Sequence, residues 1–366
     1  MSEKVLFVLK DDGNEGSNNS ARKLVELFLS NKNKASILYL KKEDGKPLLF
    51  RKRRSIYLNH ARLRKVGFFS SAYSILTNFY RLTCLFYSLR KRKIVINNAT
   101  LLDVLIVSLV AKHETFVFLR EVHLPAIFLL IIKLLSKFLG LKVLSNNHSV
   151  KNRIKSVDIT VVNNYVDLHD HGVDLSSCKD KIKILSVGAI YPLKNQIALV
   201  EMAKSLVGSV DFEIDIYGPV VDEDYHSKLI SMISYWKLDD FINIKGQVSN
   251  SELMLEYKNY HVFIQSSSFE GMSRALMDAL SFGLYCIATD VGDTNRLFVN
   301  DCGLLVTKMF DDKDREAIKC KLIAMQMNFL SVSSDVAIAR ENIRINFSSK
   351  SCIKQLEIAG LVELSL

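Results

Sequence analysis

The sequence predicts two α/β domains, each with a parallel β-sheet between layers of helices. Short apolar runs alternate with helical patterns along both halves of the chain, and strands that alternate with helices form parallel sheets. The length of 366 residues suits two domains of ordinary size. With 49% hydrophobic and 24% charged residues, the composition excludes disordered, collagen-like and small disulfide-stapled proteins.

The first half contains apolar runs of strand length and one clear helical pattern. Each run holds three to six residues and is bounded by polar or turn-forming residues, as buried strands usually are. The expected strands are Val5–Lys10, Ser36–Leu40, Ile94–Asn97, Phe116–Leu119, Val143–Ser145 and Ile159–Val162, and the expected helix is Ala21–Leu29.

The second half repeats the alternation with sharper boundaries. The expected strands are Ile182–Val187, Phe212–Tyr217, Ile242–Ile244, Val262–Gln265 and Tyr285–Thr289, and the expected helices are Gln196–Leu206, His226–Trp236, Glu252–Lys258 and Arg274–Phe282. Two such series predict two Rossmann-like domains, with a ligand at the carboxyl ends of the strands and in the cleft between the domains. A polar stretch, 169–180, marks the join. We expect domains at 1–175 and 176–345 and a carboxyl-terminal helix within 346–366.

Charge and cysteine content limit the class of protein further. The net charge is +10, with 30 Lys/Arg against 15 Asp/Glu in residues 1–180. None of the six cysteines form a C-x-x-C pair, which favours reduced thiols and a cytoplasmic location. The start lacks the apolar core of a signal peptide. The longest apolar stretch, around 125–142, is interrupted by Lys133 and Lys137, so we expect no transmembrane segment.

The strongest candidate site is the segment Glu270-Gly271-Met272-Ser273-Arg274, which follows an expected strand and opens an expected helix. Gly271 permits close approach of the backbone. The amides of Met272, Ser273 and Arg274 would form an anion site at the helix start. Asp278 lies eight residues after Glu270, so both side chains could point into one cleft. The alternative is that Glu270 is simply a helix cap.

Two further strand ends carry glycines. Gly188 follows the strand at Ile182–Val187, and Lys194 comes just before the next helix. Lysine is a mobile point charge suited to phosphate, although a solvated loop lysine is the simpler interpretation. Gly218 ends the strand Phe212–Tyr217 and alone indicates only a turn.

The first half offers weaker candidates, and we expect no metal site. Gly16 lies in a glycine-containing loop that matches neither a dinucleotide fingerprint nor a P-loop. His123 follows a strand and could face the cleft or be a structural histidine. His169 and His171 have no completing ligands nearby, and Asp222-Glu223-Asp224 is typical of a solvated loop or helix start.

The second half resembles family 4 of the glycosyltransferases, the retaining enzymes with the two-domain GT-B fold. The segment Phe269–Val306 resembles that family's Glu-x7-Glu motif with its following Ala-Thr-Asp and Gly-Leu-Leu-Val. Val187–Gln196 is similar to the family's glycine and lysine loop, Ile244–Leu253 to its Gly-x-Val loop, and Val161–Asp167 to its Asn-Gly-Val-Asp turn. The resemblance spans about 150–310.

The resemblance implies a site for a nucleotide sugar, UDP- or GDP-linked, with no other cofactor. Glu270 would contact the donor sugar, Asp278 the ribose and Lys194 the diphosphate. Val248 would lie beside the base, and His123 would approach the sugar from the first domain. The backbone at Gly16, Gly188, Gly218 and Gly271 would approach the donor, next to Met272, Ser273 and Arg274. The product would keep the donor's anomeric configuration, and no metal would be needed. The resemblance also implies that the carboxyl-terminal helix packs back on the first domain, which would bind the acceptor, while the second domain would bind the nucleotide sugar.

Three positions depart from the family pattern. Ala189 replaces an arginine, for which Arg274 or Arg296 could substitute, Asp278 replaces the second glutamate, and Ser17 replaces a glycine. The expected function is a retaining glycosyltransferase that acts on a lipid-linked intermediate of surface polysaccharide or lipopolysaccharide (capsule) biosynthesis. The alternatives are another GT-B reaction, such as epimerisation or phosphorolysis, and a non-catalytic relative that binds sugar nucleotide or an acidic polymer.

Residues 51–93 predict a contact with an anionic membrane. Val66–Tyr80 is uncharged and aromatic, and eleven Lys/Arg lie at 51–54, 62–65 and 90–93, with no acidic residue between Asp44 and Asp103. An interfacial helix at the cytoplasmic leaflet would suit this pattern. The alternative is an internal helix with a basic edge. Aromatic and basic residues also interleave in nucleic-acid binders, but no such signature accompanies them, so we expect no nucleic-acid partner.

Overall fold

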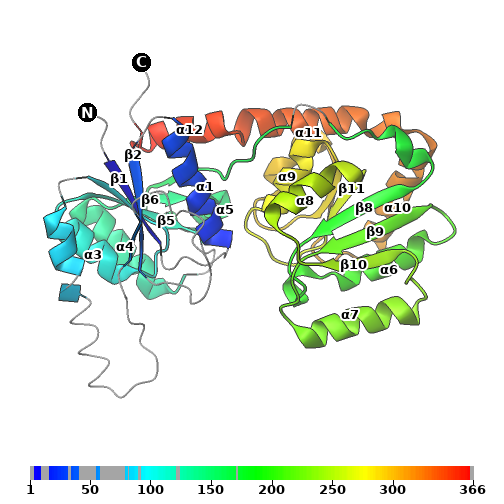
Figure 1. Ribbon diagram of the computed structural model, residues 1–366, viewed down its shortest axis with the longest axis horizontal. Helices are drawn as coiled ribbons and strands as arrows, with labels where there is room; N and C mark the ends of the chain where they lie inside the picture. The colour runs from blue at the N-terminus through cyan, green and yellow to red at the C-terminus, as the bar shows by residue number, and fades with distance from the viewer. Residues whose placement is uncertain are drawn as a thin grey trace. The chain divides into compact units, whose positions relative to one another are not determined.

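The computed structural model describes residues 4–9, 16–31, 34–40, 55–57, 79–80, 82–89, 92–120, 124–169 and 172–362. The chain divides into two compact units (Figure 1). Unit 1 comprises Met1–Asn164 and Cys352–Leu366, and unit 2 comprises Tyr165–Ser351. The sequence-based boundaries were 175/176 and 345/346. The assignment of the units to acceptor and donor stays a prediction.

Unit 1 is built on a seven-stranded parallel sheet with the order β3-β2-β1-β4-β5-β6-β7. The strands are β1 (Lys4–Leu9), β2 (Lys34–Tyr39), β3 (Ser55–Tyr57), β4 (Lys93–Ile96), β5 (Glu114–Leu119), β6 (Lys142–Ser145) and β7 (Ile159–Val161). The six strands expected in this half are therefore confirmed, and β3 is an additional edge strand.

Helices cover both faces of this sheet. They are α1 (Gly16–Ser30), α3 (Leu102–Val110), α4 (Ala126–Leu139), α5 (His148–Arg153) and the carboxyl-terminal part of α12 (Ser349–Ile358). On one face, Phe28 of α1 packs edge-on against Phe7 of β1. On the other face, α3 and α4 pack over a core that includes Ile96, Val117 and Val143. Within unit 1, the Gln355 side chain on α12 accepts a hydrogen bond from the backbone of Asn163 at 2.7 Å.

Unit 2 holds a six-stranded parallel sheet with the order β10-β9-β8-β11-β12-β13. The strands are β8 (Ile182–Val187), β9 (Phe212–Tyr217), β10 (Ile242–Gly246), β11 (Val262–Gln265), β12 (Tyr285–Thr289) and β13 (Leu304–Val306). The helices are α6 (Ile197–Leu206), α7 (Glu223–Tyr235), α8 (Asn250–Glu256), α9 (Arg274–Phe282), α10 (Asp312–Met327) and α11 (Ser333–Asn346). All five expected strands and four expected helices are confirmed, while β13, α10 and α11 had not been predicted.

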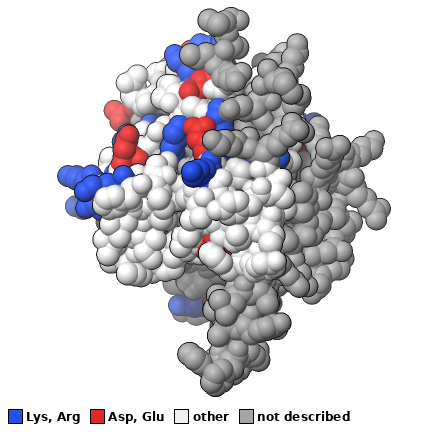
Figure 2. All heavy atoms as spheres, turned by 90° about the vertical axis from the view of Figure 1, so that its left-hand side faces the viewer, with Lys and Arg blue, Asp and Glu red and all other residues white. Residues whose placement is uncertain are grey.

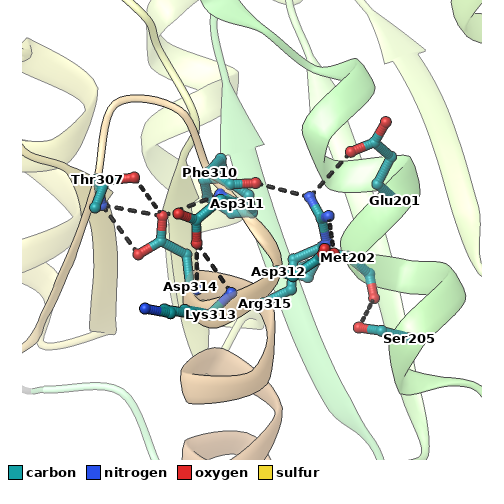
Figure 3. A network of polar contacts seen from close by, with 10 residues as sticks. All are labelled: Glu201, Met202, Ser205, Thr307, Phe310, Asp311, Asp312, Lys313, Asp314 and Arg315. Atoms are coloured by element: carbon teal, nitrogen blue, oxygen red, sulfur yellow. Dashed lines mark hydrogen bonds and ion pairs between the residues drawn. The ribbon is translucent and has the colours of Figure 1, made fainter.

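The start of α10 shows how sequence fixes a boundary in unit 2 (Figure 3). Asp311 caps the helix, and the Asp314 carboxylate returns to the Asp311 backbone, which is a reciprocal capping box. The Asp314 carboxylate also accepts the Thr307 hydroxyl hydrogen bond at 2.6 Å. Arg315 then reaches Glu201 of α6 at 3.0 Å, so α10 is tied to both β13 and α6. A similar cap, Asp222, begins α7, as expected for that acidic stretch.

Most of the basic segment 51–93 lies outside the described residues. In its described part, residues 82–88 are helical, and Leu82 and Phe86 are buried in the unit 1 core. These two side chains therefore pack inward, while the segment Val66–Tyr80, on which both alternatives depend, lies almost entirely outside the described residues. Among the described residues, no helix has the length and hydropathy needed to cross a membrane.

Candidate active site

The strand order of unit 2 contains one reversal that defines where a ligand can bind. From β8 the chain runs outward through β9 to β10, and then returns to the other side of β8 as β11. The loops after β8 and β11 therefore leave the sheet in opposite directions, and such a switch point opens a crevice at the carboxyl ends of the strands. Lys194 lies on the short helix η2 (Pro192–Lys194) after β8, and Glu270 lies in the loop after β11.

The structure pairs these two predicted residues. Lys194 Nζ donates to Glu270 Oε2 in a salt bridge, and both side chains are about four-fifths buried, with 21% and 19% of their surface exposed. An ion pair with this limited access to water is worth more than a surface pair and costs desolvation when formed. A ligand that carries both an anionic group and hydrogen-bond donors could therefore replace this pair, with its anion on Lys194 and its donors on Glu270.

Backbone contacts hold the two loops together beneath the pair. The Ser266 hydroxyl donates to the Lys194 carbonyl at 2.9 Å. The backbone NH of Ser268 donates to the Leu193 carbonyl at 2.9 Å. One of these bonds joins main chain to main chain and the other joins a side chain to main chain, and together they hold the Lys194 loop against the loop that leads to Glu270.

Two glycines permit approaches that no other residue could make. Gly218 follows β9 with φ +152°, and a Cβ there would lie 2.0 Å from the Gly188 carbonyl oxygen. Gly292 follows β12 with φ +60°, and its Cβ would lie 2.1 Å from the Glu270 carbonyl oxygen. The next residue, Asp293, donates its NH to the Gly271 carbonyl at 2.8 Å. The loop after β12 therefore supports the Glu270 loop directly.

Helix α9 begins at Arg274, where the sequence predicted its start. Ser273 is its N-cap and accepts from the Leu276 NH at 3.3 Å, so the first helical amides belong to Arg274 and Ala275 and not to Met272. Glu270 precedes the helix, and the expectation that Glu270 and Asp278 point into one cleft stays a prediction. Asp278 is buried on α9. The burial of Tyr257, and after it the nearby charge of Asp278, raises the pKa of Tyr257 well above its usual value.

Of the remaining predicted site residues, the structure describes some and not others. Val248, after β10, is partly buried against the core that includes α9. Gly188 donates its NH to the carbonyl of Tyr217, the residue before Gly218, at 2.9 Å. Gly16 is the first residue of α1. His123 lies outside the described residues, as does Glu121.

Sequence reasoning missed two features of this edge. Gln265 ends β11, is 6% exposed, and neither of its amide atoms has a hydrogen-bond partner within the described chain. A polar residue that closes the apolar run Val262–Ile264 was the available signal. Gly292 gave no signal, because its role depends on a contact between two loops.

Arg274 and Arg296, the two arginines that could replace the cation missing at Ala189, differ in their surroundings. Arg274 donates to the Tyr165 carbonyl at 3.4 Å. Arg296 lies on η4 (Thr294–Leu297), and its buried Nη1 has no partner in the described residues. Burial lowers the pKa of Arg296, and Asp293 opposes that shift. Within the described ranges, no group of three or more His, Cys, Asp or Glu side chains could hold a metal ion.

Part of this chain is similar in sequence to known proteins. Residues 173–325 match the family model described as glycosyl transferases group 1. Among curated proteins, the GtfA subunit of UDP-N-acetylglucosamine–peptide N-acetylglucosaminyltransferase from Streptococcus pneumoniae serotype 4 is 30% identical over 130 residues, or 34% of this chain. The Streptococcus gordonii subunit is 33% identical over 91 residues, or 25% of this chain. The matches span 24% and 17% of those relatives' own length.

Solved structures resemble the whole chain. Anabaena Alr3699/HepE in complex with UDP and glucose has a TM-score of 0.76 at 15% identity and covers 97% of this chain and 98% of its own. The lipopolysaccharide outer core galactosyltransferase WaaB has a TM-score of 0.74 at 16% identity, with 99% and 100% covered. At such identity the likeness establishes the fold. The chain has the GT-B fold, and its residues 173–325 match the glycosyl transferases group 1 family.

Proposed function

We propose that this protein is a retaining glycosyltransferase that binds a UDP-linked sugar on unit 2 and transfers the sugar to an acceptor hydroxyl. The observation that carries the proposal is the Lys194–Glu270 pair at the switch point of the unit 2 sheet. A nucleotide sugar has an anionic diphosphate beside a sugar rich in hydroxyl groups. One cation and one carboxylate, held together by the sheet, match those two chemistries.

Binding of the donor would separate the pair. The diphosphate would take over Lys194, whose ammonium group then compensates the charge that develops on the leaving group. Glu270 would then be able to accept hydrogen bonds from sugar hydroxyls. Arg296 Nη1 and the Gln265 amide, both buried and without a partner in the described chain, are further groups that a donor could satisfy. Asp278 is proposed for the ribose, and Val248 for the base.

The transfer itself would proceed on one face of the sugar. The bond between the anomeric carbon and the diphosphate oxygen breaks, and UDP leaves with the electron pair. The acceptor oxygen bonds to the same face of that carbon, and the acceptor proton passes to the departing phosphate. His123 and the loop before Gly16 are proposed to approach this centre from unit 1. Lys194 and the first amides of α9 would stabilise the diphosphate without a metal.

The similar proteins favour UDP over GDP as the nucleotide of the donor. The streptococcal subunits belong to UDP-N-acetylglucosamine transferases, and Alr3699/HepE was crystallised with UDP, with UDP and glucose, and with UDP-glucose. For the acceptor we propose a lipid-linked polysaccharide or lipopolysaccharide intermediate at the cytoplasmic face of the membrane, with residues 51–93 contacting anionic lipid. The streptococcal relatives are subunits of peptide N-acetylglucosaminyltransferases, and they support a second candidate, a polypeptide acceptor.

Two measurements test this proposal. We expect UDP to raise the melting temperature of the purified protein more than GDP, ADP or CMP does. Saturation at one hundred times the dissociation constant stabilises a protein by about 2.7 kcal/mol. Labelled UDP-sugars should then be hydrolysed or transferred with their anomeric configuration kept, and EDTA should leave that rate unchanged. Binding of UDP without turnover would support the non-catalytic alternative. No response to any nucleotide would refute the donor site.

A further inference from the structure

Helix α4 of unit 1 has two different faces. Its inner face packs into the unit 1 core through Ile132, which is 1% exposed, with Leu129 and Leu135 partly buried beside it. This face alone is enough to hold the helix against the sheet, because the neighbouring β5 and β6 supply buried partners such as Val117 and Val143.

The outer face of α4 is also apolar. Five large side chains of α4 are at least 46% exposed, namely Ile127 (58%), Leu130 (51%), Leu134 (46%), Phe138 (69%) and, at the helix end, Leu139 (50%). Four of them follow one another at spacings of three, four and four residues, so they form one stripe along the helix. We call these four residues, Ile127, Leu130, Leu134 and Phe138, the α4 stripe. Figure 2, which looks onto unit 1, shows a broad uncharged area with basic and acidic side chains along its upper border.

The charged side chains on α4 itself are both lysines. Lys133 and Lys137 are exposed on α4 next to the stripe, and the Lys137 ammonium lies 5.3 Å from the centre of the Phe138 ring. The stretch 122–157 contains six Lys/Arg and no Asp or Glu. Long lysine side chains can lie along an apolar surface while their ammonium groups reach an adjoining anionic layer.

We propose that the α4 stripe binds the surface of an anionic phospholipid bilayer, with the helix parallel to the membrane plane. The apolar side chains would enter the boundary between headgroups and acyl chains, and Lys133 and Lys137 would meet lipid phosphates. The 14 residues of α4 are too few to span a bilayer. A lipid partner is favoured over a protein because lysine is depleted at protein interfaces, whereas here lysines border the stripe.

This inference gives the proposed membrane location a surface within the described structure, and it rests on the proposed function only for the identity of the acceptor. It differs from the contact proposed for residues 51–93, whose described helical part packs Leu82 and Phe86 inward. The two contacts can be tested separately.

Sedimentation with lipid vesicles tests the proposal on the full chain. Wild type should bind vesicles rich in phosphatidylglycerol and not vesicles of phosphatidylcholine alone. Leu134→Glu with Phe138→Glu should lower the partition coefficient by at least about tenfold. Lys133→Ser with Lys137→Ser should weaken binding and reduce its salt dependence. The matched control is Leu255→Glu with Met327→Glu, which alters exposed apolar residues of unit 2 (63% and 80% exposed) and should change nothing.

A fluorescence reporter locates the contact. The chain has a single tryptophan, so Trp236→Phe gives a background into which Phe138→Trp can be introduced. Emission from that reporter should shift to the blue and be quenched by brominated lipid when anionic vesicles are added. A tryptophan placed instead at Leu255 should stay silent.

The possible outcomes separate the claims. If the glutamate variants bind vesicles as wild type does, the proposal is wrong. Loss of binding in a variant in which Arg51, Lys52, Arg53 and Arg54 are all changed to Ser would then assign the contact to that segment. If the same variants turn a dimer into a monomer by light scattering, the stripe is an interface between copies instead. UDP-induced stabilisation provides a check that each variant is folded. Vesicle binding without UDP binding would refute the donor site and leave this proposal standing.

Discussion

The two units share one sheet topology and use it differently. Each has its first strand flanked by the second strand on one side and the fourth on the other, so each contains the same switch point. In unit 2 the loops at that point carry Lys194 and Glu270 and are held together by backbone hydrogen bonds. In unit 1 the described surface is distinguished instead by the apolar α4 stripe. The difference teaches that this topology provides a position for a site, while the loop residues determine its chemistry.

The largest expected effect is on turnover. Glu270→Gln keeps the shape of the side chain but removes its charge, and we expect transfer from a UDP-sugar to slow by about 100-fold or more. UDP itself should bind at least as tightly, because Lys194 is released from its partner. The control is Glu223→Gln on α7, where the carboxylate side chain is 84% exposed. Unchanged turnover in Glu270→Gln would leave unit 2 without its assigned chemistry.

A substitution at Gly292 tests whether the site loops of unit 2 are as closely packed as the comparison requires. Gly292→Ala places a Cβ against the Glu270 carbonyl in a left-handed backbone conformation. We expect a loss of about 3 kcal/mol of stability from the combined strain and overlap, read from denaturant unfolding. Gly208→Ala is the matched control, since Gly208 has φ +75° with open space around it, and it should cost about 1 kcal/mol. Equal losses in the two variants would mean that the two loops are not in close contact.

A smaller effect concerns pH and one buried histidine of unit 2. His261 Nδ1 accepts from the Lys183 NH at 3.1 Å, and Nε2 lies 2.8 Å from the Ser177 hydroxyl. Burial, followed by the charge of Lys183, lowers the pKa of His261 below its usual 6.5. As pH falls below 6.5, the unfolded chain therefore takes up a proton that the folded chain does not. Stability should decline there by at most about 1.4 kcal/mol per pH unit.

Thermal unfolding between pH 7.5 and 5 measures this effect. His261→Gln should be less stable than wild type at neutral pH, because it loses those hydrogen bonds, yet its stability should depend less on pH. If the variant and wild type lose the same stability on acidification, other groups are responsible for the pH dependence.

The fold of unit 2 was readily predicted from sequence. Strands β8, β9, β11 and β12 are buried apolar runs with clear ends, and their expected bounds match those of the structure. Helices α10 and α11 had not been predicted, because their polar residues obscure the apolar spacing. Strand β3 is only three residues long, which is too short to show a period.

The site was predicted in parts. Motif resemblance selected Lys194 and Glu270, but their direct pairing depends on a sheet order that the sequence does not reveal. The start of α9 at Arg274 was predicted, and the Ser273 hydroxyl caps the helix there. Gly292 and Gln265 depend on tertiary contacts between loops. The outer face of α4 illustrates the same limit, since its apolar residues resemble core residues until the packing of the helix is known.

The account's central claim is that Lys194 holds the diphosphate of a UDP-linked donor, and calorimetric titration with UDP tests it most directly. The comparison needs wild type, Lys194→Ala and a control, Lys228→Ala, which removes an exposed lysine of α7. We predict that wild type and the control bind UDP equally, and that Lys194→Ala binds at least about tenfold more weakly while unfolding at a similar temperature without ligand. Equal affinity of Lys194→Ala and wild type for UDP would contradict the claim.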